Sequence, residues 1–510
     1  MSERLDDQRS ADVIAPIGIS GMDDILRGGL PDNCVYVVTG VPGAGKTTLA
    51  MQFLLEGVRR GERSLYITLS ESRREIQKVA RSHGWNLEGI EMCELVPSEA
   101  KLSSAAQLTV FNPSELELGE TTEAMIAAVD RFKPRRIVVD SLSELRLVAQ
   151  NTLRYRRQIL ALKQFFAGRD CTVLLLDDGT GDGGDTQLES IAHGVIKLEQ
   201  LSNQYGAERR RLRVVKMRGV PFRGGYHDFA IRKGGLDVFP RLIAAEHHAE
   251  YEDADLASGN RELDALLCGG LPLGTSTLFL GPAGTGKSTI ATLFAVAAAR
   301  RGLRSAIYVF DENLSTFRSR SRQLGIDVDD HVANGLITIQ QVDPAELSSG
   351  EFAAIVRRAV EGTDGAPHPA RVVIVDSLNG YLNAMPEEKF LTAQLHELLS
   401  FLGQRGIVSL MTVTQAGMVG SNMQSPVDTT YLADNVVLFR FFEARGHVRR
   451  AVSVIKKRSG QHERTIRELT VGANGIQIGP PLEDFQGVLT GVPTFIGRTA
   501  DLQPKGPRGA

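Results

Sequence analysis

Two glycine-rich segments of the chain combine the residue types and the spacing that bind phosphate groups. The segments GVPGAGKT (40–47) and GPAGTGKS (281–288) both fit the pattern G-x-x-x-x-G-K-[ST]. In such a loop the glycines let backbone N–H groups turn toward phosphates, the lysine reaches the terminal phosphates, and the hydroxyl helps to hold Mg²⁺. The alternative is a pair of glycine-rich turns without a ligand. The expected ATP-binding residues of the two loops are Gly43, Ala44, Gly45, Lys46, Thr47 and Thr48, and Gly284, Thr285, Gly286, Lys287, Ser288 and Thr289.

An aspartate ends each of two apolar strand-like segments farther along the chain. Asp140 ends RRIVVD, and Asp376 ends ARVVIVD. A carboxylate at the end of such a strand is expected beside the phosphates, where Mg²⁺ and its waters lie. The alternative is an aspartate that only caps a turn or a helix. Together with the hydroxyls of Thr47 and Ser288, these aspartates predict one Mg²⁺ site and one ATP site in each half of the chain.

Hydrolysis also needs a group that orients or deprotonates the attacking nucleophile. The segments LSES and FDEN follow the second strand of each half. They supply Glu71 in the first half, next to Ser70, and the adjacent Asp311 and Glu312 in the second. Glu71, Asp311 and Glu312 are the candidate catalytic residues, with Asp311 also a candidate metal ligand; solvated loop acids are the alternative. We expect the two sites to differ in rate.

A basic pair, Lys-x-Arg, recurs near the end of each half. Lys216 and Arg218 lie in VVKMRG, and Lys456 and Arg458 lie in VIKKRSG. Such residues at a strand end are often only solvated. Their repetition near the end of each sheet favours arginine fingers that reach across a subunit boundary, which requires an oligomer.

The chain is an internal duplication. The glycine-rich loop, the strand-end aspartate and the Lys-x-Arg pair recur at a nearly constant offset of about 240 residues. Short β-branched runs such as VYVVTG and TVLLLDD alternate with helical segments, which predicts an α/β fold with a mostly parallel sheet in each half. The expected domains are residues 1–246 and 247–485. A tail over 486–510, rich in glycine and proline, is a candidate regulatory segment.

Length and composition limit the remaining possibilities. A chain of 510 residues is longer than a single hydrophobic core usually supports, so two domains are expected. The net charge of −3 gives no global reason to expect a nucleic-acid or membrane partner. The four cysteines are too far apart for a C-x-x-C metal or redox pair. Neither a signal peptide nor a membrane-spanning segment is evident, and we expect a cytoplasmic protein.

With these motifs assembled, the sequence resembles the KaiC family of clock-type ATPases within the RecA superfamily. The resemblance covers almost the entire chain, including both phosphate loops, both Lys-x-Arg segments and the ending FQGVLTGVPTF (485–495). It implies two tandem RecA-like P-loop NTPase domains in a double-ring homohexamer, or a dimer of such hexamers, with ATP between neighbouring subunits. It also implies slow ATP hydrolysis in the first half and serine/threonine autokinase and phosphatase chemistry in the second. Further ATP-binding residues implied by the resemblance are Ser82, Met217, Arg450 and Lys457.

The phosphoacceptor segment departs from the family pattern. Clock members carry a Ser-Thr pair where DTTYLADNVV (428–437) places Thr430 and Tyr431. Thr430 can accept a phosphate as an aliphatic alcohol, Tyr431 is a bulkier phenol, and Thr429 is a further acceptor. Ordinary strand-entry hydroxyls are the alternative. This local pattern is more similar to non-cyanobacterial KaiC-like proteins than to the clock prototype.

Two other functions fit parts of the sequence. A DNA-dependent RecA-type motor would share the ATPase core, but the chain has a single tryptophan, Trp85, and no evident platform for base stacking. A nucleotide-gated signalling scaffold with little turnover is the second alternative. The expected cofactors are ATP and Mg²⁺, and the expected partners are further copies of the chain and a KaiB-like or sensor/response-regulator protein.

Overall fold

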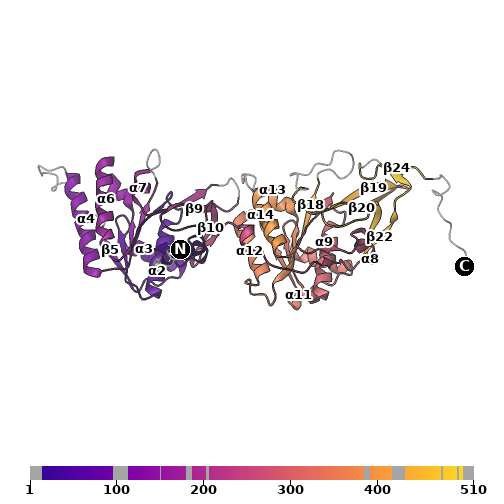
Figure 1. Ribbon diagram of the computed structural model, residues 1–510, viewed down its shortest axis with the longest axis horizontal. Coiled ribbons are helices and arrows are strands. Elements are labelled where there is room, and N and C mark those ends of the chain that lie inside the picture. Colours follow the sequence, from indigo (N-terminus) through magenta and orange to yellow (C-terminus); the bar gives the residue numbers. More distant parts are fainter. Residues whose placement is uncertain are drawn as a thin grey trace, which may run out of the picture. The chain divides into compact units, whose positions relative to one another are not determined.

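The chain divides into two compact units, Met1–Arg241 and Leu242–Ala510, each built around one large sheet (Figure 1). The computed structural model describes residues 14–95, 113–149, 151–179, 186–202, 206–383, 391–415, 431–472, 475–490 and 493–497. Within these residues the two sheets have the same strand order, which confirms the α/β prediction of two tandem RecA-like domains. Among the described helices, none combines the length and the apolarity that crossing a bilayer requires.

The first sheet has nine described strands. In sheet order they are β11 (Gly235–Phe239), β10 (His227–Arg232), β9 (Arg209–Met217), β8 (Gly194–Leu201), β3 (Val35–Thr39), β7 (Thr172–Asp177), β6 (Arg136–Asp140), β4 (Ser64–Thr68) and β5 (Ile90–Glu94). Neighbouring strands from β8 to β5 are parallel, whereas β9, β10 and β11 extend the sheet in antiparallel fashion. A short antiparallel pair, β1 (Ile14–Ala15) and β2 (Leu30–Pro31), precedes the sheet.

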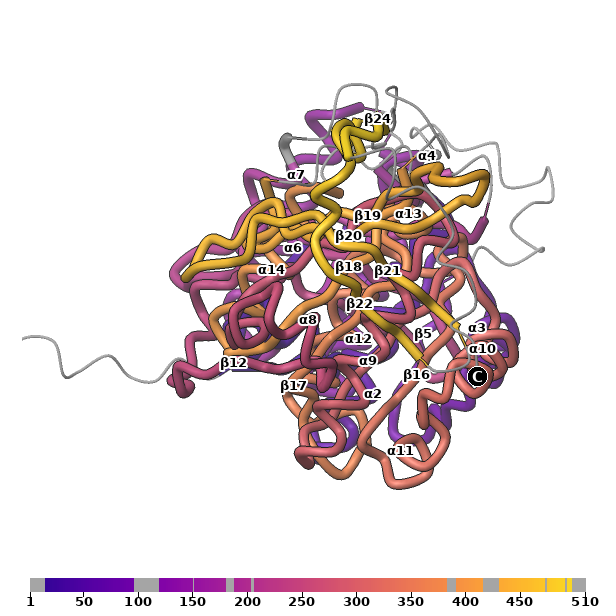
Figure 2. Tube along the Cα trace, turned by 90° about the vertical axis from the view of Figure 1, so that its right-hand side faces the viewer, coloured from indigo at the N-terminus to yellow at the C-terminus, as the bar shows by residue number. Residues whose placement is uncertain are grey.

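The second sheet repeats this arrangement. In sheet order its strands are β16 (Ile337–Gln341), β15 (Arg304–Val309), β17 (Ala370–Asp376), β18 (Val408–Thr414), β14 (Ser276–Gly281), β19 (Asn435–Ala444), β20 (His447–Lys457), β21 (Arg467–Gly472) and β22 (Gly475–Pro481). The antiparallel extension from β19 to β22 is drawn in orange to yellow in Figure 2. Two short antiparallel pairs complete the unit: β12 (Asp255–Leu256) with β13 (Leu271–Pro272), and β23 (Phe485–Gln486) with β24 (Thr494–Phe495).

Helices cover both faces of the first sheet, because side chains along a strand alternate between its faces. In β3, Tyr36 and Val38 join the core under α2, whereas Val35 and Val37 join the core under α4 to α6. Figure 1 shows α4 and α6 together on one side of this unit. The helices of the unit are α1 (Ser20–Ile25), α2 (Lys46–Arg59), α3 (Arg73–His83), α4 (Pro113–Phe132), α5 (Leu142–Ala149), α6 (Thr152–Ala167) and α7 (Thr186–Ile191).

The second sheet is covered in the same way. One core gathers side chains from α8, α9 and α10, and the other gathers side chains from α12, α13 and α14. The 3₁₀ turn η3 (Ala244–Glu246) belongs to this unit, because the Ala244 N–H donates to Glu397 Oε2 at 3.2 Å. The helices are α8 (Arg261–Leu266), α9 (Lys287–Arg300), α10 (Leu314–Gln323), α11 (Asp329–Ala333), α12 (Ser349–Glu361), α13 (Leu378–Asn383) and α14 (Leu391–Gln404).

The parallel strands of each sheet end at the same edge, which we call the carboxyl edge. The phosphate loops follow β3 and β14 there, and the aspartates Asp140 and Asp376 end β6 and β17 at the same edge. Ligands of α/β sheets bind outside the carboxyl ends of the strands. The topology therefore brings the predicted phosphate and metal ligands of each half together.

Two candidate nucleotide sites

Each glycine-rich loop leads directly into a helix, as the motif requires. Gly45 and Gly286 precede α2 and α9 and both have φ of 101°, in the left-handed region that favours glycine. A Cβ atom on Gly45 would lie 2.9 Å from Ile231 Cδ1, and one on Gly286 would lie 3.1 Å from Val471 Cγ2. No side chain caps the first turn of either helix, so the N–H groups there are available to an anion.

The lysine of the first loop is buried and bonded to its own loop. Lys46 Nζ donates to the carbonyl oxygens of Gly40 at 2.7 Å and Val41 at 3.1 Å. It also lies 2.9 Å from Oδ1 of Asp178, the residue that follows β7. Although burial works to raise it, hydrogen bonds from Ser143 and Lys46 hold the pKa of Asp178 below its usual value. The first lysine is therefore paired with a carboxylate at the point where phosphates would bind.

The lysine of the second loop has a different neighbour. Lys287 Nζ donates to Gly281 O at 2.8 Å and to Pro282 O at 2.7 Å. Since Gly281 pairs with Thr414 in β18, a threonine occupies the position that Asp178 has in the first half. Burial lowers the pKa of Lys287 to about 8. The second loop thus holds an ammonium group that titrates near neutral pH.

Each strand-end aspartate contacts the hydroxyl of its loop. Thr47 Oγ1 donates to Asp140 Oδ2 at 2.9 Å, and the Tyr66 hydroxyl donates to the same oxygen at 2.6 Å. Burial raises the pKa of Asp140, partly offset by these two hydrogen bonds and by Lys46. The predicted partners Thr47 and Asp140 are therefore adjacent in the structure.

The second half reproduces this contact with one substitution. Ser288 Oγ donates to Asp376 Oδ1 at 2.8 Å, and Thr412 Oγ1 donates to the same oxygen at 2.5 Å. Burial raises the pKa of Asp376 as well, against the hydrogen bonds of Thr412 and Ser288. As the second hydroxyl donor to the strand-end aspartate, Thr412 of β18 thus replaces Tyr66 of β4.

These hydroxyl–carboxylate pairs fit Mg²⁺. Mg²⁺ prefers hard oxygen ligands and is usually bound by one or two protein groups together with waters and substrate phosphates. Among the described residues, no three His, Cys, Asp or Glu side chains gather into a metal site. A metal ion at either loop would therefore depend on the nucleotide for most of its ligands.

The candidate catalytic acid of the first half lies close to the strand-end aspartate. Glu71 follows β4 and is half-buried, and its Oε2 atom has no hydrogen-bond partner in the part of the chain that the structure describes. Burial raises the pKa of Glu71, and the charges of Asp140 and Glu75 raise it further. A partly buried carboxylate with a free oxygen and a raised pKa has the properties of a general base or of a group that orients water. Ser70 beside it is exposed.

The acids of the second half both have protein partners. Asp311 accepts a short hydrogen bond from the Ser377 hydroxyl. Glu312 forms an ion pair with Arg320, with 2.9 Å between Nη2 and Oε2. Arg320 also donates from Nη1 to Thr289 Oγ1 at 3.2 Å. Two carboxylates and an arginine therefore converge on the second loop.

A cleft of about 530 Å³ opens at the second loop. It is lined by Ala283, Gly284, Gly286, Lys287, Ser288, Thr289, Asp311, Glu312, Arg320, Leu324, Asp376, Ser377, Thr412, Thr414 and Val471. The cleft brings together the predicted loop residues, the strand-end aspartate and both predicted catalytic acids. Arg450, on β20, reaches the same loop, since its Nε donates to Gly284 O at 3.1 Å.

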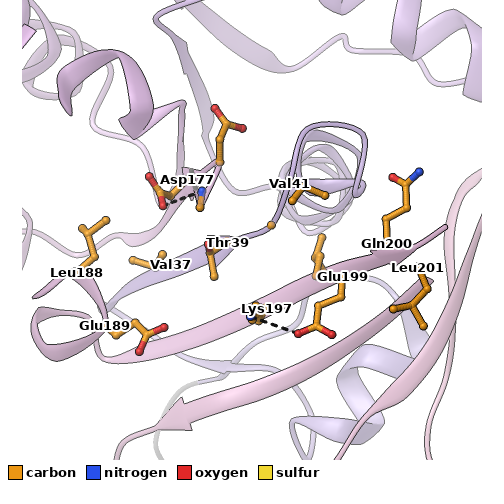
Figure 3. A pocket seen from close by; sticks show the side chains of 14 residues that line it. Val37, Thr39, Val41, Asp177, Leu188, Glu189, Lys197, Glu199, Gln200 and Leu201 are labelled. Atoms are coloured by element: carbon orange, nitrogen blue, oxygen red, sulfur yellow. Dashed lines mark hydrogen bonds and ion pairs between the residues drawn. The ribbon is translucent and has the colours of Figure 1, made fainter. Parts of the chain in front are cut away.

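A smaller cavity of about 330 Å³ lies beside the first loop (Figure 3). Figure 3 shows Val37 and Thr39 of β3 beside the neighbouring strand β8, where Lys197 and Glu199 form an ion pair at 3.3 Å. The cavity also contacts Asp178, the partner of Lys46. The carboxyl edge is thus hollowed on this face of β3 too.

The Lys-x-Arg pair of the first half lies far from its own phosphate loop. Lys216 pairs with Val195 near the start of β8, and β8 is parallel to β3, so the pair lies at the edge opposite the carboxyl edge. Lys216 Nζ donates to Glu189 O at 2.6 Å, and Arg218 Nη2 donates to Ser190 O at 3.0 Å. Within one chain, this pair and the first loop occupy opposite edges of the sheet.

The second pair is placed in the same way. Lys456 Nζ donates to Ala433 O at 2.7 Å, and Arg458 Nη1 lies 2.9 Å from Asp434 Oδ1, just before β19 begins. Tyr431, one predicted phosphoacceptor, lies three residues before Asp434 and is 57% exposed. The other, Thr430, lies outside the described residues, as does Thr429.

Three further residues implied by the family resemblance make contacts outside the phosphate loops. The Ser82 hydroxyl donates to Val79 O within α3. Met217 is buried in the core of the first unit. Lys457 Nζ donates to Leu267 O at 2.6 Å.

Sequence reasoning missed several residues of the two sites. Asp178 ends the run TVLLLDD, and its position after an apolar strand was a usable signal of the same kind as Asp140. Arg320 lies two helical turns beyond Glu312, a spacing that signals contact only once the helix is known. Tyr66 and Thr412 lie inside strands, where nothing in the local sequence marks them.

Comparisons with known proteins identify the family. A family model described as ATPase, KaiC, matches residues 15–243 and 256–483. The circadian clock oscillator protein KaiC of Thermostichus vulcanus is 27% identical over 498 residues, which cover 96% of this chain and 94% of the relative. The circadian clock protein KaiC3 of Synechocystis sp. is 26% identical over 490 residues and 94% of each chain. With both halves matched by the family model and both phosphate loops in place, the chain belongs to the KaiC family of ATPases.

Proposed function

We propose that the chain hydrolyses ATP at both loops and that each site is completed by a neighbouring copy of the chain. One observation carries this proposal. In each half the phosphate loop and its aspartate lie at the carboxyl edge, whereas the Lys-x-Arg pair lies at the opposite edge of the same sheet. A basic pair so placed can reach a nucleotide only in another subunit, as arginine fingers supplied in trans do.

The roles of the site residues follow from their positions. Lys46 and Lys287 bind the terminal phosphates; Thr47 with Asp140, and Ser288 with Asp376 and Asp311, are the residues that would hold Mg²⁺. When bound, Mg²⁺ neutralises phosphate charge and orients the transferred group.

The carboxylates orient the nucleophile. Glu71 in the first half, and Glu312 with Asp311 in the second, hold the attacking water or hydroxyl and accept its proton. The buried Oε2 atom of Glu71, which has no hydrogen-bond partner among the described residues, supports this role in the first site.

The assembly is a homohexamer, the form implied by the family resemblance. Adjacent subunits contribute Lys216 and Arg218 to the first-half sites, and Lys456 and Arg458 to the second-half sites. Arg450 differs from these four, because it already contacts its own loop at Gly284. We assign it to the ATP site of its own chain.

The second half is also a serine/threonine autokinase. Tyr431 is exposed beside the segment that Lys456 and Arg458 contact, at the edge opposite its own loop. Phosphate transfer to Thr430 or Tyr431 would therefore occur between subunits. Relatives named as circadian clock proteins suggest that phosphorylation and assembly state carry a signal, read by a KaiB-like or response-regulator partner.

The test follows free phosphate and protein-bound phosphate together with γ-labelled ATP and Mg²⁺. Wild type, Lys46→Ala and Lys287→Ala are compared. Label on the protein that only Lys287→Ala abolishes supports the kinase assignment. Release of phosphate without label on the protein would support a two-site ATPase and reject the autokinase activity. Absence of both nucleotide binding and turnover would overturn the proposal.

A further inference from the structure

Arg320 lies on the same side of α10 as the cleft. Asn313 caps this helix, since its Oδ1 accepts the Thr316 N–H at 2.8 Å, and Glu312 immediately precedes the cap. Arg320 follows the cap by seven residues, close to two helical turns, so it lies on the face of α10 beneath the cap and reaches back to Glu312. The arginine and the carboxylate both line the cleft.

The guanidinium of Arg320 forms a bridge between two elements. Nε and Nη2 donate to Glu312 at 3.3 and 2.9 Å, in the two-point geometry that fixes a carboxylate plane. Nη1 donates at 3.2 Å to Thr289, in the first turn of α9, the helix that begins with Lys287. Because two of these three hydrogen bonds go to Glu312, the main contact of the guanidinium within the protein is this carboxylate.

The first half lacks this bridge. Val79 occupies the position in α3 that corresponds to Arg320, eight residues beyond the glutamate in each half. Glu71 correspondingly has an oxygen without a hydrogen-bond partner. The arginine is therefore a feature of the second site that the duplication does not explain.

We propose that Arg320 is a positioning residue of the second-half site, which fixes the carboxylate of Glu312 relative to the phosphate loop. The inference rests on the proposed function, in which Glu312 orients the nucleophile. By tying Glu312 to α9, Arg320 keeps the carboxylate in register with Lys287 and Ser288 when the nucleotide enters the cleft. A fixed carboxylate orients a nucleophile better than a mobile one, and loss of such positioning lowers turnover more than binding.

The experiment uses the full chain carrying Lys46→Ala, so that ADP formation reports the second half for both hydrolysis and phosphate transfer. Arg320→Met, Arg320→Lys and Glu312→Gln are compared, together with Arg320→Met in the Glu312→Gln protein. The control is Arg318→Met, on the same helix but 46% exposed and 3.7 Å from Asp329. Size-exclusion chromatography and thermal melting verify that each variant folds and assembles like its parent.

We expect Arg320→Met to lower kcat on the order of 100-fold with KM for ATP nearly unchanged, and Arg320→Lys to restore part of the loss. In the Glu312→Gln protein the same change should add little, because Arg320 acts through that carboxylate. A raised KM with kcat unchanged, full additivity with Glu312→Gln, or behaviour equal to Arg318→Met would each overturn the inference. Absence of ATP turnover in the Lys46→Ala parent would instead contradict the proposed function, namely ATP hydrolysis at the second-half site.

Discussion

The two nucleotide sites share a scaffold but differ in how their charges are paired. In the first half the loop lysine has a carboxylate partner, Asp178, while the catalytic candidate Glu71 has a free oxygen. In the second half Thr414 stands at the sheet position of Asp178, while Glu312 is bound by Arg320. In the first site an ion pair thus holds the phosphate-binding lysine, whereas in the second site an ion pair holds the candidate catalytic glutamate.

This difference shows what duplication preserves. The loop, the strand-end aspartate and their hydrogen bond are kept because backbone geometry fixes them. Neighbouring positions on β7 and β18, or on α3 and α10, are free to change charge without altering the fold. Two sites with one architecture can therefore bind and turn over ATP differently.

The largest expected effect comes from the acids. Glu71→Gln should lower first-half turnover by roughly 10²–10⁴-fold, since it removes the carboxylate that orients the nucleophile and accepts its proton.

The positions next to these glutamates should differ between the halves. Ser70→Ala should change first-half turnover little, whereas Asp311→Asn, at the matching position, should lower second-half turnover strongly. ADP formation in the Lys287→Ala background reports turnover of the first half, and ADP formation in the Lys46→Ala background reports turnover of the second half. Equal effects of Ser70→Ala and Asp311→Asn would contradict the difference between the sites.

A smaller effect concerns pH and the second loop. The pKa of Lys287 is lowered to about 8 by burial, so the group is charged below that pH and neutral above it. Because phosphates bind the charged form, ATP affinity at the second site should weaken roughly tenfold between pH 7 and pH 9. Titration of a fluorescent ATP analogue into the Lys46→Ala protein checks this. A flat profile over this range would show that the lysine does not titrate there.

The smallest expected effect tests the pairing of the first lysine. Asp178→Asn should tighten ATP binding at the first site by about 3- to 10-fold, because the partly buried ion pair no longer competes with phosphate. Thr414→Asp should weaken binding at the second site by a similar factor. The dissociation constant for ATP is measured for Asp178→Asn in the Lys287→Ala background and for Thr414→Asp in the Lys46→Ala background. Weaker binding by Asp178→Asn would mean that Asp178 assists the nucleotide.

Much of the fold follows from local sequence. The loops, the apolar strands and the aspartates that end them are continuous patterns, so their meeting at the carboxyl edge could be predicted. The two-sheet duplication follows from the repetition of these patterns. The contact of Thr47 with Asp140 joins two recognisable motifs, each of which the sequence predicts to lie at the Mg²⁺ site.

The missed contacts share a different property. Asp178 approaches Lys46 only because β7 lies next to β3 in the sheet, an order that the sequence does not state. Lys457, next to Lys456 in the motif, points away from its neighbour because successive strand residues face opposite sides of a sheet. Such details depend on the order and pleat of strands rather than on motif spacing.

In the proposed assembly, each sheet offers its Lys-x-Arg edge to one neighbouring copy and its phosphate-loop edge to another. Contacts between unlike edges are head-to-tail, and such contacts close into a ring or continue as a filament, depending on the rotation between copies. A nucleotide that bridges two edges is also a cross-link, so its binding and the association of subunits strengthen each other by mass action. Dilution of the protein and depletion of ATP would then have the same consequence, namely dispersal into subunits that each hold only half of every site.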